Sequence, residues 1–164
     1  MQLEGSCHCG AVKFRVRSRY PVPYQRCYCS ICRKTQGGGG WAVNLGADHA
    51  TLKVTGRRHI RVYHAKLRQP GLARAPRSPA ERHFCGACGS ALWLYDQRWP
   101  EQIHPFASAI DTVLPVPPRH THLMLAFKAP WVEVQARRGD RQHQHYPEES
   151  LAAWHERTGL VDDD

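Results

Sequence analysis

Short stretches of alternating apolar and polar residues run along most of this chain. In residues 11–17, Val12, Phe14 and Val16 alternate with basic side chains. Because successive side chains of a strand point to opposite faces, this alternation predicts a strand with one buried face. Further short apolar stretches, separated by glycine or proline, cover 41–45, 51–55, 59–63, 81–94, 103–110, 122–127 and 131–134. The pattern predicts a mainly β fold built from small sheets.

The clearest helical signal lies near the C-terminus, at residues 147–158. Pro147 suits a first turn, Glu148 and Glu149 complement the positive N-terminal end of a helix dipole, and Gly159 predicts the stop. By contrast, the prolines and glycine of residues 66–80 predict a surface loop that is more prone to disorder than the rest of the chain.

The length of the chain, 164 residues, suffices for one hydrophobic core and is short for two, so we expect one domain. No apolar run is long enough to cross a bilayer. Residues 1–5 lack the basic and apolar segments of a secretory signal. These features predict a cytoplasmic protein without a membrane partner, and they leave the oligomeric state open.

The net charge of +9 raises nucleic acid as a partner. Many of the cations, however, lie in residues 57–82, which are rich in proline and glycine, and others are Arg137, Arg138 and Arg141. Solvated loops account for this distribution better, so nucleic acid is a possible partner that the sequence does not favour.

The seven cysteines fall into three motifs, at residues 7–9, 27–32 and 85–88. In a reducing compartment such cysteines are metal ligands or catalytic thiols more often than disulfides, and an odd number would leave one unpaired. Since every cysteine belongs to a motif, we expect each thiol to bind a metal ion.

The central motif is Cys27-x-Cys29-x-x-Cys32, flanked by Arg26, Arg33 and Lys34. Zinc ligated at about 2.3 Å brings its sulfurs to about 3.8 Å from one another. Alternate side chains of an extended strand stand about 6.6 Å apart, so the motif predicts a bent knuckle. Three protein ligands leave one position of a tetrahedral ion open, which is typical of catalytic zinc.

The remaining cysteines, Cys7, Cys9, Cys85 and Cys88, would complete a closed four-cysteine site that joins distant parts of the chain. Cys85-Gly-Ala-Cys88-Gly has the form of a zinc-knuckle hairpin. Such structural zinc contributes on the order of 10–16 kcal/mol to folding in model peptides. Spacing alone leaves a competing division open, in which two cysteines of the central motif join Cys85 and Cys88.

The motifs G-x-C-x-C-G at 5–10, C-x-C-S-x-C-R-K at 27–34, R-x-F-C-x-x-C-G-S-x-L at 82–92 and Trp131-Val132 resemble the glutathione-dependent formaldehyde-activating enzyme family, whose domain also occurs in centromere protein V. The resemblance implies a mainly β, Mss4-like zinc fold of small antiparallel sheets with a short C-terminal helix. It implies a zinc-binding domain over residues 3–135, followed by an extension over 136–164.

By this resemblance two zinc ions bind per chain, a structural one at Cys7, Cys9, Cys85 and Cys88 and a second at Cys27, Cys29 and Cys32. The implied activity is that of a carbon–sulfur lyase, which joins glutathione or another thiol to formaldehyde or a small aldehyde. Zinc in the open site would activate the substrate thiol. Arg26, Arg33 and Lys34 could bind its carboxylates.

Two other hypotheses for the function stay open. In the first, the protein is a non-catalytic zinc module that binds nucleic acid or an acidic protein, and His83 or His64 completes the second site. In the second, Cys27, Cys29 and Cys32 form a redox or metal-relay cluster. His8 and His83, which neighbour proposed ligands, are candidates for acid–base groups, although such histidines more often only pack.

Overall fold

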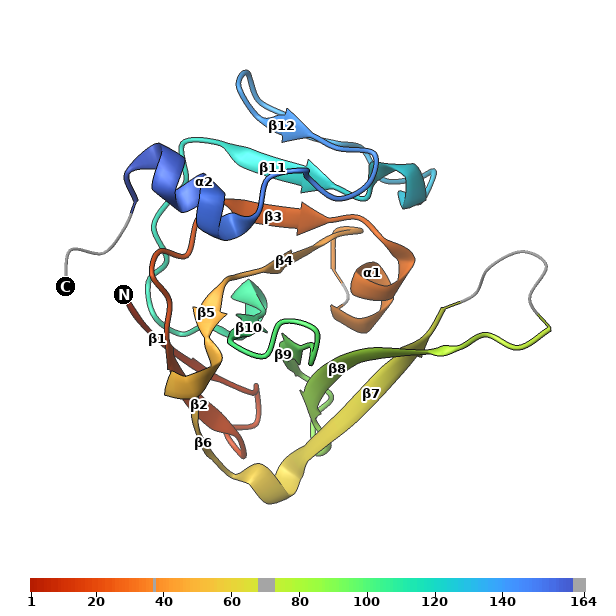
Figure 1. The fold of residues 1–164 in the computed structure, drawn as a ribbon. Coiled ribbons are helices and arrows are strands. Elements are labelled where there is room, and N and C mark those ends of the chain that lie inside the picture. Colours follow the sequence, from red (N-terminus) through yellow and green to blue (C-terminus); the bar gives the residue numbers. More distant parts are fainter. Residues whose placement is uncertain (37, 68–72, 161–164) are drawn as a thin grey trace.

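A computed structural model describes residues 1–36, 38–67 and 73–160. Within these ranges the chain forms three small sheets (Figure 1), so the mainly β prediction is confirmed. The strands are β1 (Gln2–Ser6), β2 (Lys13–Arg17), β3 (Tyr24–Cys27), β4 (Ala42–Asn44), β5 (Ala47–Asp48), β6 (Lys53–Thr55), β7 (Ile60–Lys66), β8 (Arg77–Cys85), β9 (Ala91–Tyr95), β10 (Gln102–Pro105), β11 (His120–Leu123) and β12 (Arg141–Gln142). Single 3-10 turns lie at His49–Thr51, Arg57–His59, Ala107–Ala109 and Leu125–Phe127.

The first sheet, in the order β1-β2-β6, contributes its apolar face to the main core. Phe14 and Val16 of β2 are buried while the basic residues between them are exposed, as the alternation predicted. The Phe14 ring meets Trp93 of β9 edge to face, with 5.1 Å between the ring centroids. This contact joins the first sheet to the second.

The second sheet has the order β5-β10-β9-β8-β7, and its strands β7 and β8 form a long ribbon (Figure 1). The prediction of a loop over 66–80 was wrong at both ends, because Lys66 pairs with Arg77 and β8 includes Pro79. Proline is tolerated there because the register shifts between His64 and Lys66, so Pro79 lies where the ladder is interrupted. The part of this prediction at 68–72 lies outside the described residues.

The third sheet, in the order β12-β11-β3-β4, is mixed rather than antiparallel. Strand β11 runs parallel to both β3 and β12, whereas β3 and β4 are antiparallel. The strand predicted at 122–127 ends at Leu123, and Met124, with φ of 62°, begins a 3-10 turn. Residues 131–134, which were also predicted to be a strand, form a turn and irregular backbone.

Two α-helices lie within the described ranges. Helix α1 (Ser30–Gln36) was not predicted, and it begins directly after Cys29. Helix α2 (Leu151–Thr158) confirms the predicted C-terminal helix but begins later than residue 147, because the Ser150 hydroxyl caps it by accepting a hydrogen bond from the amide of Ala153. It ends at Gly159 as predicted, with φ of 65°.

Helix α2 lies beside the start of β3 (Figure 1), where His155 is buried and its Nε2 lies 2.6 Å from the carbonyl oxygen of Val22. This contact attaches the C-terminal segment to the third sheet. Neither helix in the described part of the chain has the length and apolar character needed to cross a membrane.

Candidate metal centres

Four cysteines from two distant hairpins meet in one cluster, formed by Cys7, Cys9, Cys85 and Cys88. The Sγ atoms of Cys7 and Cys9 are 3.5 Å apart, and those of Cys9 and Cys85 are 3.8 Å apart. Sulfurs that share one zinc ion lie about 3.8 Å apart, so this set of donors fits a tetrahedral zinc site. Cys85 and Cys88 therefore lie with Cys7 and Cys9, not with the central motif as the competing division had it.

Two turns of the same form shape this cluster. In the first, the amide of Gly10 donates to the carbonyl of Cys7, and in the second the amide of Gly89 donates to the carbonyl of Cys85. Both glycines have positive φ, 74° and 77°, a conformation that glycine adopts without steric cost. The Ser90 hydroxyl lies 3.2 Å from the sulfur of Cys88 and lowers the pKa of that exposed thiol to about 5.

The other three cysteines, Cys27, Cys29 and Cys32, form a second cluster in which the sulfurs lie within 4.8 Å of one another. Cys27 ends β3, and Cys32 lies in α1, so the change from strand to helix produces the bend that the spacing required. The amide of Cys32 points at the sulfur of Cys29, 3.4 Å away. Among the described residues, no histidine or carboxylate joins this cluster.

The three sulfurs interact strongly because they are close and mostly buried. Hydrogen bonds from Cys27 and Cys32 lower the pKa of Cys29 to about 2, and the interactions with Cys29 and Cys32 raise the pKa of Cys27 above its ordinary value. One sulfur is thus stabilised as a thiolate while a neighbour keeps its proton. A cation held between the three would remove this conflict.

Arg82 of β8 supplies a cation beside the three sulfurs. Its side chain is 9% exposed, one terminal nitrogen lies 3.8 Å from the sulfur of Cys32, and its Nε has no hydrogen-bond partner among the described residues. A buried guanidinium is costly unless an anion compensates it. Three thiolates around a divalent ion carry one net negative charge, which Arg82 would neutralise, so these residues fit zinc.

A buried hydrogen-bond network supports the three-cysteine cluster from behind. The Tyr28 hydroxyl lies 2.8 Å from Nδ1 of His122, and Nε2 of His122 lies 3.2 Å from the Asp140 carboxylate. That carboxylate also accepts hydrogen bonds from the amides of His120 and Arg137. Asp140 thereby fixes β11 against the residue between Cys27 and Cys29.

Burial alone would raise the pKa of Asp140, but the hydrogen bonds it accepts more than compensate, so its pKa is lowered. Because the carboxylate accepts from Nε2 of His122, the Nδ1 atom of that ring is left to accept from Tyr28. Burial raises the pKa of the Tyr28 hydroxyl, which favours its role as a neutral donor.

The three predicted substrate cations occupy different environments. Arg26 lies over the ring of Trp41, 4.6 Å from its centroid, and a terminal nitrogen lies 3.2 Å from Nε2 of His120. Arg33 has a buried Nε with no partner among the described residues, whereas Lys34 is exposed. Arg26 is thus contacted by Trp41 and His120, and its buried Nε, like that of Arg33, has no hydrogen-bond partner among the described residues.

The candidate histidines do not complete the three-cysteine cluster. His83 stacks on Trp93 with 5.1 Å between ring centroids, and burial lowers its pKa. The His64 ring nitrogen Nδ1 lies 3.1 Å from the carbonyl of Ser78. The amide of His8 donates to the Ser90 hydroxyl beside the four-cysteine cluster. These histidines have structural contacts, and no ligand role is assigned to them.

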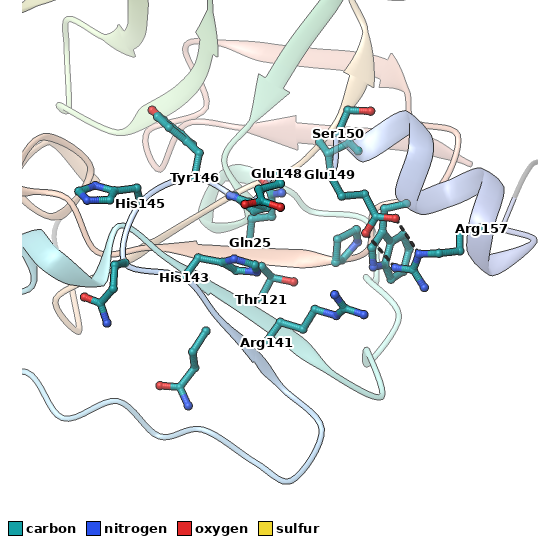
Figure 2. Close-up of a pocket in the computed structure, with 16 residues that line it drawn as sticks. Gln25, Thr121, Arg141, His143, His145, Tyr146, Glu148, Glu149, Ser150 and Arg157 are labelled. Atoms are coloured by element: carbon teal, nitrogen blue, oxygen red, sulfur yellow. Dashed lines mark hydrogen bonds and ion pairs between the residues drawn. The ribbon is translucent and has the colours of Figure 1, made fainter.

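A groove of about 650 Å³ lies between the third sheet and the C-terminal segment. Figure 2 shows Gln25, Thr121 and Arg141 on the sheet and residues from His143 to Arg157 around them. A salt bridge between Glu149 and Arg157 closes one end, with nitrogen–oxygen distances of 2.6 and 2.9 Å. Sequence reasoning had no signal for this groove, because its walls come from segments more than a hundred residues apart.

A family match and a sequence relative agree on one family. Residues 2–125 match the family described as glutathione-dependent formaldehyde-activating enzyme. A protein of Halomonas elongata, provisionally named as such an enzyme, is 59% identical over 160 residues, 98% of each chain. A crystal structure of a Rhodobacter sphaeroides protein covers 70% of this chain and 92% of its own, with 26% identity and a TM-score of 0.52.

Proposed function

Because this chain belongs to the glutathione-dependent formaldehyde-activating enzyme family, we propose that it is a zinc-dependent carbon–sulfur lyase acting at Cys27, Cys29 and Cys32. Its substrates would be glutathione or a related thiol and formaldehyde or another small aldehyde. A structural zinc ion would bind to Cys7, Cys9, Cys85 and Cys88 and contribute only to stability.

One observation carries the proposal: three sulfurs converge, and no fourth protein ligand accompanies them among the described residues. A purely structural site would be expected to recruit a histidine or carboxylate, and His64 and His83 are both held elsewhere. The buried Arg82 beside Cys32 supports the same interpretation, since its charge matches an ion with three thiolates.

In the reaction, the substrate sulfur adds to the carbonyl carbon of the aldehyde. A carbon–sulfur bond forms, the carbonyl π bond breaks, and the thiol proton ends on the new hydroxyl group. Zinc bound to the three cysteines would lower the pKa of the substrate thiol and polarise the carbonyl. Arg82 would neutralise the net negative charge of the zinc-loaded cluster. Asn44, whose side-chain amide lies 3.9 Å from the sulfur of Cys32, would fix the position of that ligand.

Charged groups around the cluster suit an acidic thiol. The free donor of Arg33 supports the prediction that this residue binds a carboxylate of glutathione. Lys34 is exposed on the same helix and would contribute to attraction of an anion more than to its orientation. Arg26 would act through its contacts with Trp41 and His120, as a support for β3.

The test compares the wild type with Cys29→Ser and with Ser30→Ala, an exposed neighbour in the same segment. We expect two zinc ions per chain in the wild type and about one in Cys29→Ser, by elemental analysis. Formation of the adduct between glutathione and formaldehyde, followed by exchange NMR, should fall to the spontaneous rate in Cys29→Ser and stay unchanged in Ser30→Ala.

Equal rates for wild type and Cys29→Ser would refute the proposed activity, as would a wild-type rate no higher than that of the spontaneous reaction. Circular dichroism melting of Cys29→Ser separates loss of the site from loss of the fold, because the four-cysteine cluster remains intact in that variant.

A further inference from the structure

We propose that the groove formed by the C-terminal segment binds the peptide arm of a short peptide thiol whose sulfur reacts at Cys27, Cys29 and Cys32. The inference rests on the proposed function and adds a binding subsite to it. Residues 141–157 supply most of the groove, and they lie beyond the part of the chain, 2–125, that matches the family.

The register of the third sheet places the groove and the cluster on one face. Directly paired residues of neighbouring strands share a face, and alternate residues of one strand do so too. Arg141 pairs with Thr121, Thr121 with Gln25, and Leu123 with Cys27. The row that forms the groove floor therefore lies one side-chain repeat before the row that contains Cys27.

The distance along this face suits a molecule of about three residues. Arg141 lies two strands and one side-chain repeat from Cys27, which corresponds to about 12 Å between their Cα atoms. In a tripeptide with a central cysteine, the sulfur is separated from either end by no more than about two residues, or about 7 Å, and the Arg141 side chain has to span the remainder. A peptide whose sulfur lies at the cluster could thus place its far end at Arg141.

Tyr146 connects the two places. It lines the groove and is largely exposed there. The backbone next to it is attached to the cluster, because the amide of Met124, which packs against these cysteines, donates to the carbonyl of His145.

The side chains of the groove match a zwitterionic peptide. The Arg141 guanidinium has no hydrogen bond or ion pair within the described part of the chain, and a guanidinium binds a carboxylate through two parallel hydrogen bonds. Glu148 offers an acceptor for an ammonium group, and Gln25 and Thr121 offer an amide and a hydroxyl for peptide bonds.

The salt bridge between Glu149 and Arg157 leaves Arg141 free to bind a carboxylate of the ligand. Glu149 lines the groove and could compete for Arg141, but both of its oxygens accept from Arg157. The hydrogen bonds of Arg157 lower the pKa of Glu149, and the charge of Arg141 contributes less. The groove therefore contains the ion pair of Glu149 with Arg157 at one end and, on its floor, the exposed Arg141, whose guanidinium has no partner among the described residues.

The test measures binding of S-methylglutathione, whose blocked sulfur cannot react, to the zinc-loaded protein by isothermal titration calorimetry. We expect Arg141→Ala to weaken binding about tenfold or more, because a charge-assisted hydrogen-bonding group is lost. Arg141→Lys should be intermediate, since it keeps the charge but not the paired donors. Arg138→Ala, an exposed cation outside the groove, should bind like the wild type.

Wild-type affinity in Arg141→Ala, or no binding of S-methylglutathione to the wild type at millimolar concentration, would overturn the inference. The result is separate from the proposed activity. If Arg141→Ala binds S-methylglutathione weakly while the wild type has no turnover, the result supports the binding groove and refutes the lyase activity. If the wild type has turnover and Arg141→Ala binds S-methylglutathione normally, the result refutes only the binding role of the groove.

Discussion

The two cysteine clusters of this protein are made from similar pieces but are enclosed in different ways. Cys7, Cys9, Cys85 and Cys88 come from two matching turns and provide the full set of ligands for a tetrahedral ion. Cys27, Cys29 and Cys32 come from one bend, and their surroundings are completed by groups that are not ligands, Arg82 among them. Two matching turns thus supply four ligands, whereas a single bend supplies three.

The largest effect is expected from removing a ligand of the four-cysteine cluster. Cys85→Ser should prevent stable folding, because structural zinc contributes about 10–16 kcal/mol in model peptides and a whole domain is stable by about 5–15 kcal/mol. Loss of the cooperative thermal transition in circular dichroism would be the readout. A Cys85→Ser protein that melts like Cys29→Ser would show that the two clusters do not differ in structural importance.

The next largest effect is expected at Arg82, which belongs to the open cluster alone. Arg82→Met should lower stability by about 3–5 kcal/mol in the zinc-loaded protein, since one partner of a buried charge pair is lost. It should also release the zinc of the three-cysteine site at lower chelator concentrations. Urea unfolding and a chelator titration measure the two effects, and Arg82→Lys should restore part of both. Unchanged zinc retention would argue against charge compensation.

A smaller loss is expected from the support behind the open cluster. Asp140→Asn should lower stability by about 3 kcal/mol, because charge-assisted hydrogen bonds to His122 and two amides are weakened. The pKa of Asp140 is lower in the folded protein than in the unfolded chain. Its contribution is therefore complete above the unfolded pKa of about 3.9 and is lost as the pH falls toward the folded value.

Urea unfolding of wild type and Asp140→Asn from pH 7 down to pH 3 tests this sign. The difference in unfolding free energy should be constant above about pH 5 and shrink below about pH 4. A gap that widens as the solution becomes more acidic would mean that Asp140 is not held as a carboxylate.

The smallest effect is expected at the two glycines that end the turns of the four-cysteine cluster. Gly10→Ala should cost about 1 kcal/mol, because alanine is strained at φ of 74° although its Cβ would meet no atom within 4 Å. Zinc content and turnover should not change. Gly89→Ala provides the matched variant in the second turn, and thermal melting of the two should show equal shifts if the turns are equivalent.

The sequence was informative wherever a feature depends on neighbours in the chain. Cysteine spacing predicted that the thiols gather in metal-binding motifs but left their division between two sites open, whereas alternation predicted β2 and Gly159 predicted the end of α2. It was uninformative where distant segments decide. The pairing of Lys66 with Arg77 overrode the proline signals, and α1 begins at a bend that the cysteine motif alone did not identify as helical.

The residues that surround the open cluster were missed for the same reason. Arg82 opens the motif at 82–92 and Asp140 belongs to no motif, but neither pattern indicated that these residues lie beside Cys32 and His122. Arg26, for which substrate binding stays a prediction, contacts Trp41 and His120, and the sequence did not indicate either contact. Sulfur chemistry can be read from spacing, whereas the second layer of contacts depends on sheet register.

The parallel pairing of β3 with β11 has a consequence for biosynthesis. Tyr28 and His122 are 94 positions apart, so three reactive thiols leave the ribosome long before the strand that braces them. Pairings of such long sequence separation form slowly. Tyr28 therefore gains its hydrogen bond to His122 only after most of the chain has been synthesised.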